Sequence, residues 1–452
     1  MSTQTEISST HTCQNKGCHH APLTLERINA KQITVGVVGL GYVGLPLSLT
    51  MVEEGVSVIG FDIDIAKIEA LQKGSSYYKH IDAARVASSI ESKRLLASSD
   101  YSQICKCDVV VICVPTPLDH HLEPDLSYIS QTCESIAEFI APHTLVSLES
   151  TTWPGTTEEV VKPIIESKGT VRLDEDLYLS FSPEREDPGN KEYTTKTIPK
   201  LVGGSNRKSL ELAQAFYSLS IDNVIAVGST RVAEASKLFE NIFRGVNIAL
   251  VNEMKIICDS MNIDVWEVIK AASTKPFGYM PFSPGPGLGG HCIPIDPYYL
   301  SWKAREFGVA TRFIELAGEI NRSMPLYVVS KVQDCLNLHE KSVKGSKILV
   351  LGVAYKADID DMRESPSLKL MELLLEKGAI VNYHDPYFPE IGSTREYQFL
   401  KGMQSRNLSS DYDCFLLATD HSCFSPQEIL SYGVPCVDTR NFLSKHDNVY
   451  KA

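Results

Sequence analysis

Short, continuous apolar runs recur along the first part of the chain, at 33–38, 56–62, 109–114, 144–148 and 177–181. Runs of this length are typical of strands that are buried on both faces of a parallel sheet. Helix-length segments separate them, beginning with 45–54. The pattern therefore predicts a doubly wound α/β domain.

The pattern changes at about residue 231. From there to about residue 261, apolar residues such as Leu238, Ile242 and Val246 recur at helical spacing, with no proline or strand pattern between them. A single helix of this length spans roughly 45 Å, and such a helix usually bridges domains or builds a subunit interface. Further helices are predicted at 265–272 and 311–336.

A third region begins with an apolar run at 347–354, followed by a predicted helix at 368–377 and strands at 380–385 and 414–418. This second α/β unit lacks a complete glycine fingerprint, so we expect it to bind a different ligand from the first. The predicted fold class is α/β, with two Rossmann-like doubly wound domains joined by a helical domain that contains a long central helix. The predicted divisions are a disordered N-terminal tail at 1–30, a first Rossmann domain at 31–228, a central helical domain at 229–340 and a second Rossmann-like domain at 341–452.

Composition narrows the class of protein. A chain of 452 residues is too long for one core, and its net charge of −13 argues against a general nucleic-acid surface but not against an anionic small substrate. No apolar run approaches the roughly 20 residues that cross a bilayer, and the first thirty residues lack a signal-peptide core, so no membrane partner is predicted. The twelve cysteines are scattered, mostly in apolar stretches, which indicates reduced thiols and a cytoplasmic protein.

The N-terminal tail contains a group of potential metal ligands: His11, Cys13, Cys18, His19 and His20. Their spacing could bind a metal ion, but no second ligand pair follows at zinc-finger spacing. We therefore predict a disordered tail and no metal site.

A dinucleotide fingerprint lies between the first predicted strand and helix: Gly39, Gly41, Tyr42, Val43 and Gly44. The first glycine permits the tight turn, the second lets the backbone approach a pyrophosphate, and the third allows the helix to pack closely on the strand. Asp62 ends the second strand, 18 residues after Gly44, where an acid accepts from the ribose hydroxyls and repels a 2′-phosphate. The sequence predicts NAD rather than NADP, with a flavin as the main rival.

Two polar segments, Pro115-Thr116 and Ser150-Thr151, each follow a predicted parallel strand. They therefore lie at the carboxyl edge of the sheet, where open α/β sheets bind ligands. A turn proline and capping hydroxyls are the alternative interpretation of either segment taken alone.

Cys292 lies in a glycine-rich loop, with the carboxylate of Asp296 four residues on. An ordinary dehydrogenase needs only a base, whereas a cysteine can trap an aldehyde covalently so that a second hydride leaves from the same carbon. Together with the NAD fingerprint, this thiol predicts a four-electron oxidation of an alcohol to a carboxylate. A thiol buried in a core is the alternative, which four nearby glycines make hard to accept.

Five motifs support a resemblance to a known family: 39–44, 182–190, 235–241, 284–296 and 355–366. In order and spacing, from about residue 32 to the end, the chain resembles the UDP-glucose/GDP-mannose dehydrogenase family. The motifs around Glu184 and Cys292 are similar to those of its N-acetylhexosamine branch, and most of all to the UDP-N-acetylglucosamine 6-dehydrogenases. The lysine that the glucose branch carries before the aspartate of the Cys292 loop is Ile295 here, and the second acid of its glutamate motif falls on Pro188. Both differences argue against UDP-glucose as the preferred substrate.

The resemblance implies a role for each catalytic residue. Cys292 is the nucleophile, while Lys237 and Asn241, one helical turn apart, hold the alcohol oxygen and stabilise the developing oxyanions. Glu184, assisted by Thr151, positions or deprotonates the hydrolytic water. Asp296 supports that water or holds Lys237.

The same resemblance implies the binding residues. Arg363 reaches the NAD, and Lys67 packs at the adenine ribose. The remaining residues are expected to contact the UDP-sugar: Glu184, Arg185, Lys237, Asn241, Arg244, Gly287, Gly289, Tyr355, Lys356 and Arg440. The active site is expected in a cleft between the first and third domains, with the helical domain as its floor and as a dimer interface.

The resulting hypothesis is an NAD-dependent four-electron oxidation of UDP-N-acetylglucosamine at C6, for a surface polysaccharide precursor, by a homodimer or higher homo-oligomer. UDP-N-acetylmannosamine, UDP-N-acetylgalactosamine and UDP-glucose are the alternative substrates. A two-electron β-hydroxyacid dehydrogenase is a second hypothesis, but that class uses a lysine without the cysteine and has no third α/β domain. A catalytically silent NAD-binding regulatory protein is the third.

Overall fold

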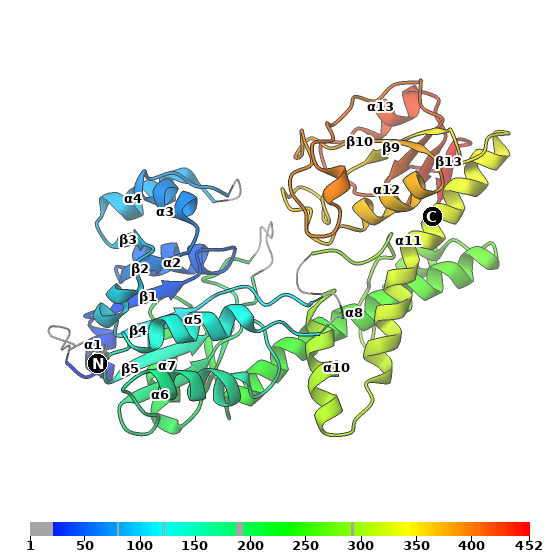
Figure 1. Ribbon diagram of the computed structural model, residues 1–452. Coiled ribbons are helices and arrows are strands. Elements are labelled where there is room, and N and C mark those ends of the chain that lie inside the picture. Colours follow the sequence, from blue (N-terminus) through cyan, green and yellow to red (C-terminus); the bar gives the residue numbers. More distant parts are fainter. Residues whose placement is uncertain (1–20, 79–80, 120, 122, 187–192, 291–292) are drawn as a thin grey trace, which may run out of the picture.

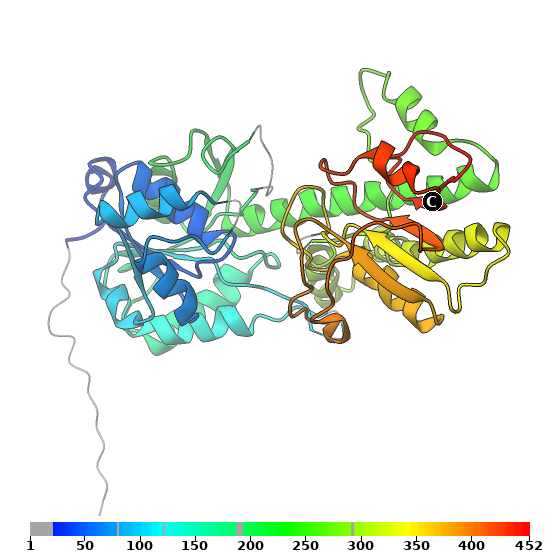
Figure 2. The same cartoon turned by 90° about the horizontal axis from the view of Figure 1, so that it is seen from above.

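The computed structural model describes residues 21–78, 81–119, 121, 123–186, 193–290 and 293–452. Two α/β domains lie on either side of a helical region, and a long helix runs from the first domain beneath the third (Figures 1 and 2). The predicted fold class is confirmed.

The first domain contains an eight-stranded sheet of order β3-β2-β1-β4-β5-β6-β7-β8. Its strands are β1 (Thr34–Val38), β2 (Ser57–Phe61), β3 (Leu95–Ser98), β4 (Val109–Ile112), β5 (Thr144–Leu148), β6 (Leu177–Phe181), β7 (Lys200–Gly204) and β8 (Val224–Val227). The first six strands have the order of a dinucleotide-binding Rossmann sheet, and only the β6–β7 pair is antiparallel. The sequence pattern predicted the buried strands β1, β2, β4, β5 and β6, but not β3, β7 and β8.

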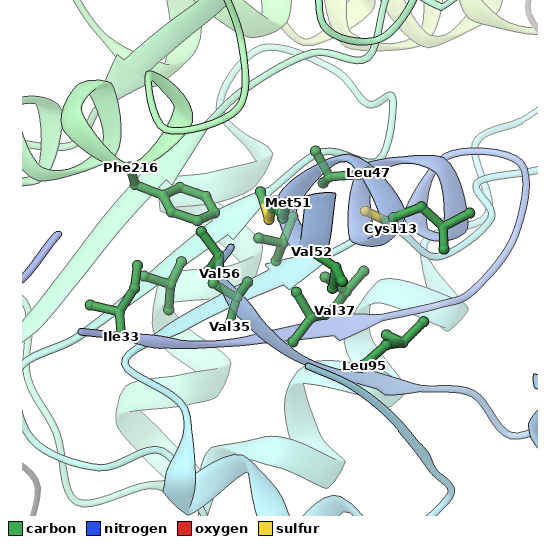
Figure 3. Close-up of a cluster of buried hydrophobic side chains, with 14 of the residues drawn as sticks. Ile33, Val35, Val37, Leu47, Met51, Val52, Val56, Leu95, Cys113 and Phe216 are labelled. Atoms are coloured by element: carbon green, nitrogen blue, oxygen red, sulfur yellow. The ribbon is translucent and has the colours of Figure 1, made fainter. Parts of the chain in front are cut away.

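Helices cover both faces of this sheet. They are α1 (Leu25–Asn29), α2 (Gly44–Glu53), α3 (Ile65–Gln72), α4 (Ala83–Glu91), α5 (Ser127–Ala137), α6 (Lys162–Lys168) and α7 (Arg207–Tyr217), with a 3₁₀ turn η1 (Tyr101–Lys106) and a π-helical turn η2 (Thr157–Val161). One core packs α2 and α7 against β1 and β2 (Figure 3), and a second packs α5 and α6 on the opposite face. The crevice at the carboxyl ends of β1 and β4, where the strand order reverses, is the expected ligand position of such a sheet.

Helix α1 corrects the predicted N-terminal tail. Residues 21–30 were expected to be disordered, yet Leu23 and Ile28 are buried and the Arg27 guanidinium lies 2.7 Å from the Asp108 carboxylate. Helix α1 packs on α7 and covers apolar surface that would otherwise face water. The potential metal ligands between His11 and His20 lie outside the described residues.

The central region consists of α8 (Thr230–Ser260), α9 (Val265–Ala272), α10 (Asp296–Glu306) and α11 (Arg312–Leu338). Helix α8 is 31 residues long, as its apolar spacing predicted, and packs along α11 and α10. Its first turns also contact β7 and η2 of the first domain. One rigid helix therefore connects the first domain to the helices beneath the third.

The third domain contains a parallel five-stranded sheet of order β10-β9-β11-β12-β13. Its strands are β9 (Lys347–Leu351), β10 (Ile380–His384), β11 (Cys414–Leu417), β12 (Cys436–Asp438) and β13 (Val449–Lys451), and its helices are α12 (Pro366–Glu376), α13 (Pro426–Ser431) and the short 3₁₀ turn η3 (Gln398–Leu400). Helices α11 and α12 cover one face, and α13 packs on the other. This strand order is the second common doubly wound arrangement, with its ligand crevice between β9 and β11.

No helix among the described residues is long and apolar enough to cross a membrane. Eight described cysteines carry free thiols, and all of these except Cys423 are buried, whereas Cys105 is disulfide-bonded. The expectation of reduced, buried thiols therefore holds for most of the described cysteines.

Candidate active site

The glycines of the dinucleotide fingerprint have different structural roles. Gly39 has a positive φ of 94°, and a Cβ on it would lie 2.7 Å from the Cys113 carbonyl oxygen. A Cβ on Gly44 would lie 1.9 Å from the Gly39 oxygen, whereas a Cβ on Gly41 would meet nothing within 4 Å. The outer glycines thus serve the packing of the turn, and the middle one leaves space for a ligand. This open position at the start of α2 fits the pyrophosphate of NAD.

Asp62 connects the fingerprint to the end of β2. Its Oδ2 accepts from the Leu40 N–H at 2.9 Å and from the Lys67 ammonium at 3.1 Å. The Tyr77 hydroxyl donates to the Leu40 carbonyl at 2.5 Å, which fixes the turn from the other side. Asp62 and Lys67 therefore lie together beside the glycine turn, where the adenine ribose was expected.

Arg363 comes from the third domain but lies on the fingerprint of the first. Its guanidinium carbon is 4.3 Å from the centroid of the Tyr42 ring, and it forms an ion pair with Asp361 at 2.7 Å. The Tyr42 ring in turn packs on Tyr78 at 4.3 Å. The third domain thus covers the glycine turn, in keeping with the prediction that Arg363 reaches the NAD.

The two polar segments at the carboxyl edge of the sheet are held together. The Ser150 hydroxyl donates to the Val114 carbonyl at 2.7 Å, so the segments after β4 and β5 lie side by side. Thr116 is buried, Thr151 is half-buried and Pro115 is exposed. The arrangement fits the expected passage of NAD along this edge.

Three of the predicted catalytic residues meet where α8 passes the start of α10. Lys237 and Asn241 are both buried on α8, and the Asn241 amide donates to Asp296 Oδ2 at 2.5 Å. Burial raises the pKa of Asp296 to about 6, although the nearby Lys237 charge and the Asn241 hydrogen bond act in the opposite direction. Cys292 itself lies outside the described residues, but the segment that follows it is anchored to α8 through Asp296.

Glu184 lies in the loop after β6 and is held by a residue that the sequence reasoning missed. The Lys200 ammonium, at the start of β7, lies 3.2 Å from Glu184 Oε2 and 3.1 Å from Glu149 Oε2. Burial opposes ionisation of Glu184, but Lys200 and two backbone N–H groups outweigh it, so the pKa of Glu184 lies below its ordinary value. The candidate base is therefore a carboxylate at neutral pH.

Arg185 has a structural partner. Its guanidinium pairs with Glu240 on α8 and donates to the Pro199 carbonyl at 2.9 Å. The pair fixes the Glu184 loop against the turn of α8 that also carries Asn241. Arg185 thus positions the loop, and its predicted contact with substrate stays a prediction.

Glu234 is a second missed residue. Its carboxylate, wholly buried on α8, accepts from the Gly155 N–H at 2.5 Å and from the N–H and hydroxyl of Thr157 at 2.9 and 2.7 Å. Burial raises the pKa of Glu234, and these hydrogen bonds oppose the rise. The contacts pin the segment after Thr151 to the same helix as Lys237.

The glycine-rich loop before Cys292 rests on a chain of amides. Asn321 of α11 donates to the Gly245 carbonyl of α8 at 3.0 Å and accepts from the Asn252 amide at 2.9 Å. Asn252 then accepts from the Gly285 N–H at 3.0 Å. This chain fixes the loop to both long helices, and no motif pointed to it.

The third domain packs on the same loop. A Cβ on Gly289 would lie 2.6 Å from Tyr355 Cβ, and one on Gly285 would lie 2.7 Å from the Arg440 guanidinium. The Gly290 N–H donates to the Arg363 carbonyl at 3.1 Å. The predicted residues Tyr355, Gly289 and Arg440 are therefore brought together, with an exposed Lys356 beside Tyr355.

Arg244 differs from the other predicted substrate residues. It was expected on the Lys237 face of α8, but it is exposed whereas Lys237 is buried. Its contact with the sugar stays a prediction.

A cavity of about 400 Å³ lies where the three domains meet. Its lining includes Leu118 of the first domain, Ile242 and Asn321 of α8 and α11, and Glu364 of the third domain. Gly287 also lines it. The position agrees with the expected cleft, while Lys237, Glu184 and Arg440 lie outside the lining of this cavity.

Three domain models of one family match the chain in order. The NAD binding domain of the UDP-glucose/GDP-mannose dehydrogenase family matches residues 33–221, its central domain residues 231–323 and its UDP binding domain residues 349–445. The chain belongs to the UDP-glucose/GDP-mannose dehydrogenase family. It is accordingly an NAD-dependent UDP-sugar dehydrogenase, and the predicted family, enzyme class and cofactor are confirmed.

Individual relatives act on different sugars. The UDP-N-acetyl-D-glucosamine 6-dehydrogenase of Pseudomonas aeruginosa is 36% identical over 400 residues, 87% of this chain and 92% of that protein. The UDP-N-acetyl-D-mannosamine dehydrogenase of Methanococcus maripaludis is 33% identical over 396 residues, 86% of each chain. The solved UDP-D-ManNAc dehydrogenase from Pyrococcus horikoshii is 30% identical and covers 93% of this chain and 99% of its own, with a TM-score of 0.83.

Proposed function

We propose that this member of the family oxidises the C6 alcohol of UDP-N-acetylglucosamine to the carboxylate in two hydride transfers, with Cys292 as the nucleophile. The observation that carries the proposal is the buried cluster of Lys237, Asn241 and Asp296 at the segment that follows Cys292. A cation and an amide donor beside the reacting carbon can hold the alcohol and then stabilise an alkoxide or tetrahedral adduct.

The Gly39–Gly44 turn, Asp62 and Arg363 would hold NAD, which would supply the hydride acceptor for each of the two oxidations at C6. In the first oxidation, Lys237 and Asn241 hold the C6 oxygen while the alcohol proton passes to water. The Cys292 thiolate then adds to the aldehyde carbon, which gives a thiohemiacetal. Loss of the second hydride from this adduct leaves a thioester on Cys292.

Hydrolysis completes the reaction. Glu184 takes a proton from a water molecule, the resulting hydroxide adds to the thioester, and the carbon–sulfur bond breaks. The products are the carboxylate and the free Cys292 thiol. The low pKa of Glu184 suits this role, because a base must be ionised before it accepts the proton.

The choice of UDP-N-acetylglucosamine is supported by the motifs around Glu184 and Cys292 and by the 36% identical relative of that specificity. The similar UDP-N-acetylmannosamine dehydrogenases favour the second candidate, UDP-N-acetylmannosamine. A single hydroxyl epimer separates the two sugars, and a few polar contacts decide between them. A carboxylated N-acetylhexosamine would serve as a surface polysaccharide precursor.

The substrate is tested by incubating the protein with NAD and one UDP-sugar at a time, from UDP-N-acetylglucosamine, UDP-N-acetylmannosamine, UDP-N-acetylgalactosamine and UDP-glucose. The mass of the product and kcat/KM are then compared. We expect the acid product from all accepted sugars and the highest kcat/KM for UDP-N-acetylglucosamine. A higher value for another epimer would reject the assigned substrate and keep the reaction.

A homodimer is also proposed, formed through α8. Large apolar side chains are exposed along this helix, including Phe239 at 70%, Leu250 at 56% and Ile257 at 44%. A second copy that covers this stripe would remove apolar surface from water. Sedimentation of the native chain and of Leu250→Glu tests this interface. We expect the native chain to be a dimer and the variant a monomer, and a dimeric variant would contradict the proposed interface.

A further inference from the structure

The starting observation is a buried cation between two carboxylates. The Lys200 side chain is 5% exposed, and the Glu149 and Glu184 side chains are 0% and 14% exposed. The ammonium lies 3.1 Å from Glu149 and 3.2 Å from Glu184. Glu149 directly follows β5, Glu184 lies in the loop after β6 and Lys200 begins β7, so the three groups come from three adjacent positions in the sheet.

The antiparallel pairing of β6 and β7 produces this arrangement. In its register Ser180 lies opposite Gly204 and Phe181 opposite Gly203. Continued past the end of β6, the same register places Glu184 opposite Lys200, and the Ser182 hydroxyl donates to the Leu201 carbonyl at 2.8 Å along the way. The contact is therefore a cross-strand pair fixed by the backbone.

The two carboxylates differ in their other partners. Glu184 Oε1 accepts the N–H groups of Arg185 and Glu186 at 2.7 and 2.6 Å, and both bonds favour the ionised form. Glu149 Oε1 accepts only the Tyr217 hydroxyl, at 2.7 Å. Burial raises the pKa of Glu149, whereas the pKa of Glu184 is lowered. The other partners of Glu184 therefore favour its ionised form more than those of Glu149 do.

Other titratable groups surround the pair. Cys113, from the end of β4, is buried, and burial raises the pKa of its thiol well above the ordinary value. Glu186, in the same loop as Glu184, has its pKa raised to about 7 by burial and by the Glu184 charge. The Arg185 guanidinium is turned away to Glu240 on α8. Among the residues that the structure describes, Lys200 is therefore the cation that contacts Glu184 directly.

We infer that Lys200 is a positioning residue for the hydrolytic step: it holds Glu184 as a fixed carboxylate, and Glu149 anchors the Lys200 ammonium from the other side. The inference rests on the proposed role of Glu184 as the base that activates water. Lys200 contacts no reacting atom in this scheme, so its loss leaves both hydride transfers intact and slows only the release of the thioester. Without the cation, Glu184 also takes up a proton at higher pH, because the ionised form loses its main stabilising charge.

The test compares Lys200→Met with Lys200→Arg, and with the surface control Lys196→Met, whose exposed ammonium pairs with Glu54. With UDP-N-acetylglucosamine as substrate, stopped flow measures the NADH formed in the first turnover. The steady-state kcat is then measured as a function of pH. For Lys200→Met we expect a burst of two NADH per subunit, a steady-state kcat lower by about 100-fold, and an acidic limb moved to higher pH. The thioester should be detectable by mass spectrometry, Lys200→Arg should restore most of the kcat, and Lys196→Met should behave as the native chain.

If Lys200→Met does not fold, the double variant Lys200→Met/Glu149→Gln removes one buried charge of each sign and is expected to show the same stall. The inference would be overturned if the NADH burst and the steady-state kcat decreased together with no shift of the acidic limb of the pH profile. An unchanged kcat would also overturn it. These outcomes are separable from failure of the proposed function. The native chain must give two NADH per sugar for the proposed function to stand, whatever the Lys200 variants do.

Discussion

The two α/β domains contain the same turn with different surroundings. Gly39 follows β1 with a φ of 94°, and Gly352 follows β9 with a φ of 83°. In both turns the next N–H donates to an acid that ends the second strand: Leu40 to Asp62 at 2.9 Å, and Val353 to Asp385 at 2.7 Å. Both doubly wound domains thus contain the same glycine turn, held by a hydrogen bond to an acid.

The surroundings of the two acids decide which turn can hold a dinucleotide. Asp62 shares its oxygen with Lys67, whose side chain is 28% exposed, and α2 begins five residues after the glycine. Asp385 is fully buried and lies 3.1 Å from His421 Nε2, while α12 begins fourteen residues after its glycine. Both acids are buried, but only the first turn therefore combines an acid paired with a partly exposed lysine and a nearby helix N-terminus for the pyrophosphate. A glycine turn alone does not indicate a dinucleotide site.

The largest effect is expected from Gly44→Ala. Its Cβ would overlap the Gly39 carbonyl oxygen at 1.9 Å, and this oxygen belongs to the backbone of the turn, so it cannot move aside as the end of a flexible side chain could. We expect a loss of more than about 3 kcal/mol in stability, or failure to fold. Gly41→Ala is the matched control, because its Cβ meets no atom within 4 Å. Thermal unfolding measures the melting temperatures of both variants. Equal melting temperatures would refute the different roles assigned to Gly44 and Gly41.

The second largest effect is expected at Asp385, the buried acid beside the glycine turn of the third domain. Asp385→Ala leaves His421 Nε2 and the Val353 N–H buried without the acceptor they now share, so we expect a loss of about 3 to 5 kcal/mol, with the KM for NAD unchanged. Burial opposes ionisation of Asp385, but His421 and backbone N–H groups outweigh it and lower its pKa. Its contribution is therefore present at neutral pH and lost as the pH falls below about 4.

Urea unfolding at pH 7 and pH 3 measures this difference, with the exposed Asp411→Ala as control. A change in the KM for NAD in Asp385→Ala would show that the third-domain turn takes part in cofactor binding. That result would remove the contrast between the two turns.

Gly41→Val tests whether the glycine turn of the first domain binds NAD. The Cβ of the added side chain would enter the space left for the pyrophosphate, with no protein atom within 4 Å of it. We expect the KM for NAD to rise about 100-fold, equivalent to about 2.7 kcal/mol, with an unchanged melting temperature. Gly392→Val, also at an open position but in the third domain, should leave the KM for NAD as it is. An unaffected KM in Gly41→Val would place the pyrophosphate elsewhere.

The smallest expected effect is on the choice of cofactor. Asp62→Ser removes the negative charge that repels a 2′-phosphate, so the preference for NAD over NADP should fall by about tenfold. The kcat/KM ratio for the two cofactors measures it. A preference that survives the substitution would mean that another group rejects the phosphate.

The sequence predicted the parts of the fold that are long or fully buried. Continuous apolar runs identified β1 and β9, and unbroken helical spacing identified α8. Strands β12 and β13 have three residues each, too few for a period, and β8 is an edge strand with exposed positions. Helix α1 was missed because five residues inside a polar segment carry almost no periodic signal.

The candidate site shows the same limit. Lys237 and Asn241 could be placed on one face because their spacing is a helical turn, and the structure joins Asn241 to Asp296. Lys200 and Glu149 carry no local signal, because a lysine that starts a strand and an acid that ends one are ordinary. Their contact with Glu184 exists only through the antiparallel register of β6 and β7, which no local pattern specifies.

The most direct test of the covalent four-electron mechanism is the NADH yield at exhaustion of limiting UDP-N-acetylglucosamine, for the native chain and for Cys292→Ala. The account predicts two NADH per sugar from the native chain, and no more than one from the variant. One NADH from the native chain, or two from the variant, would contradict the role of Cys292.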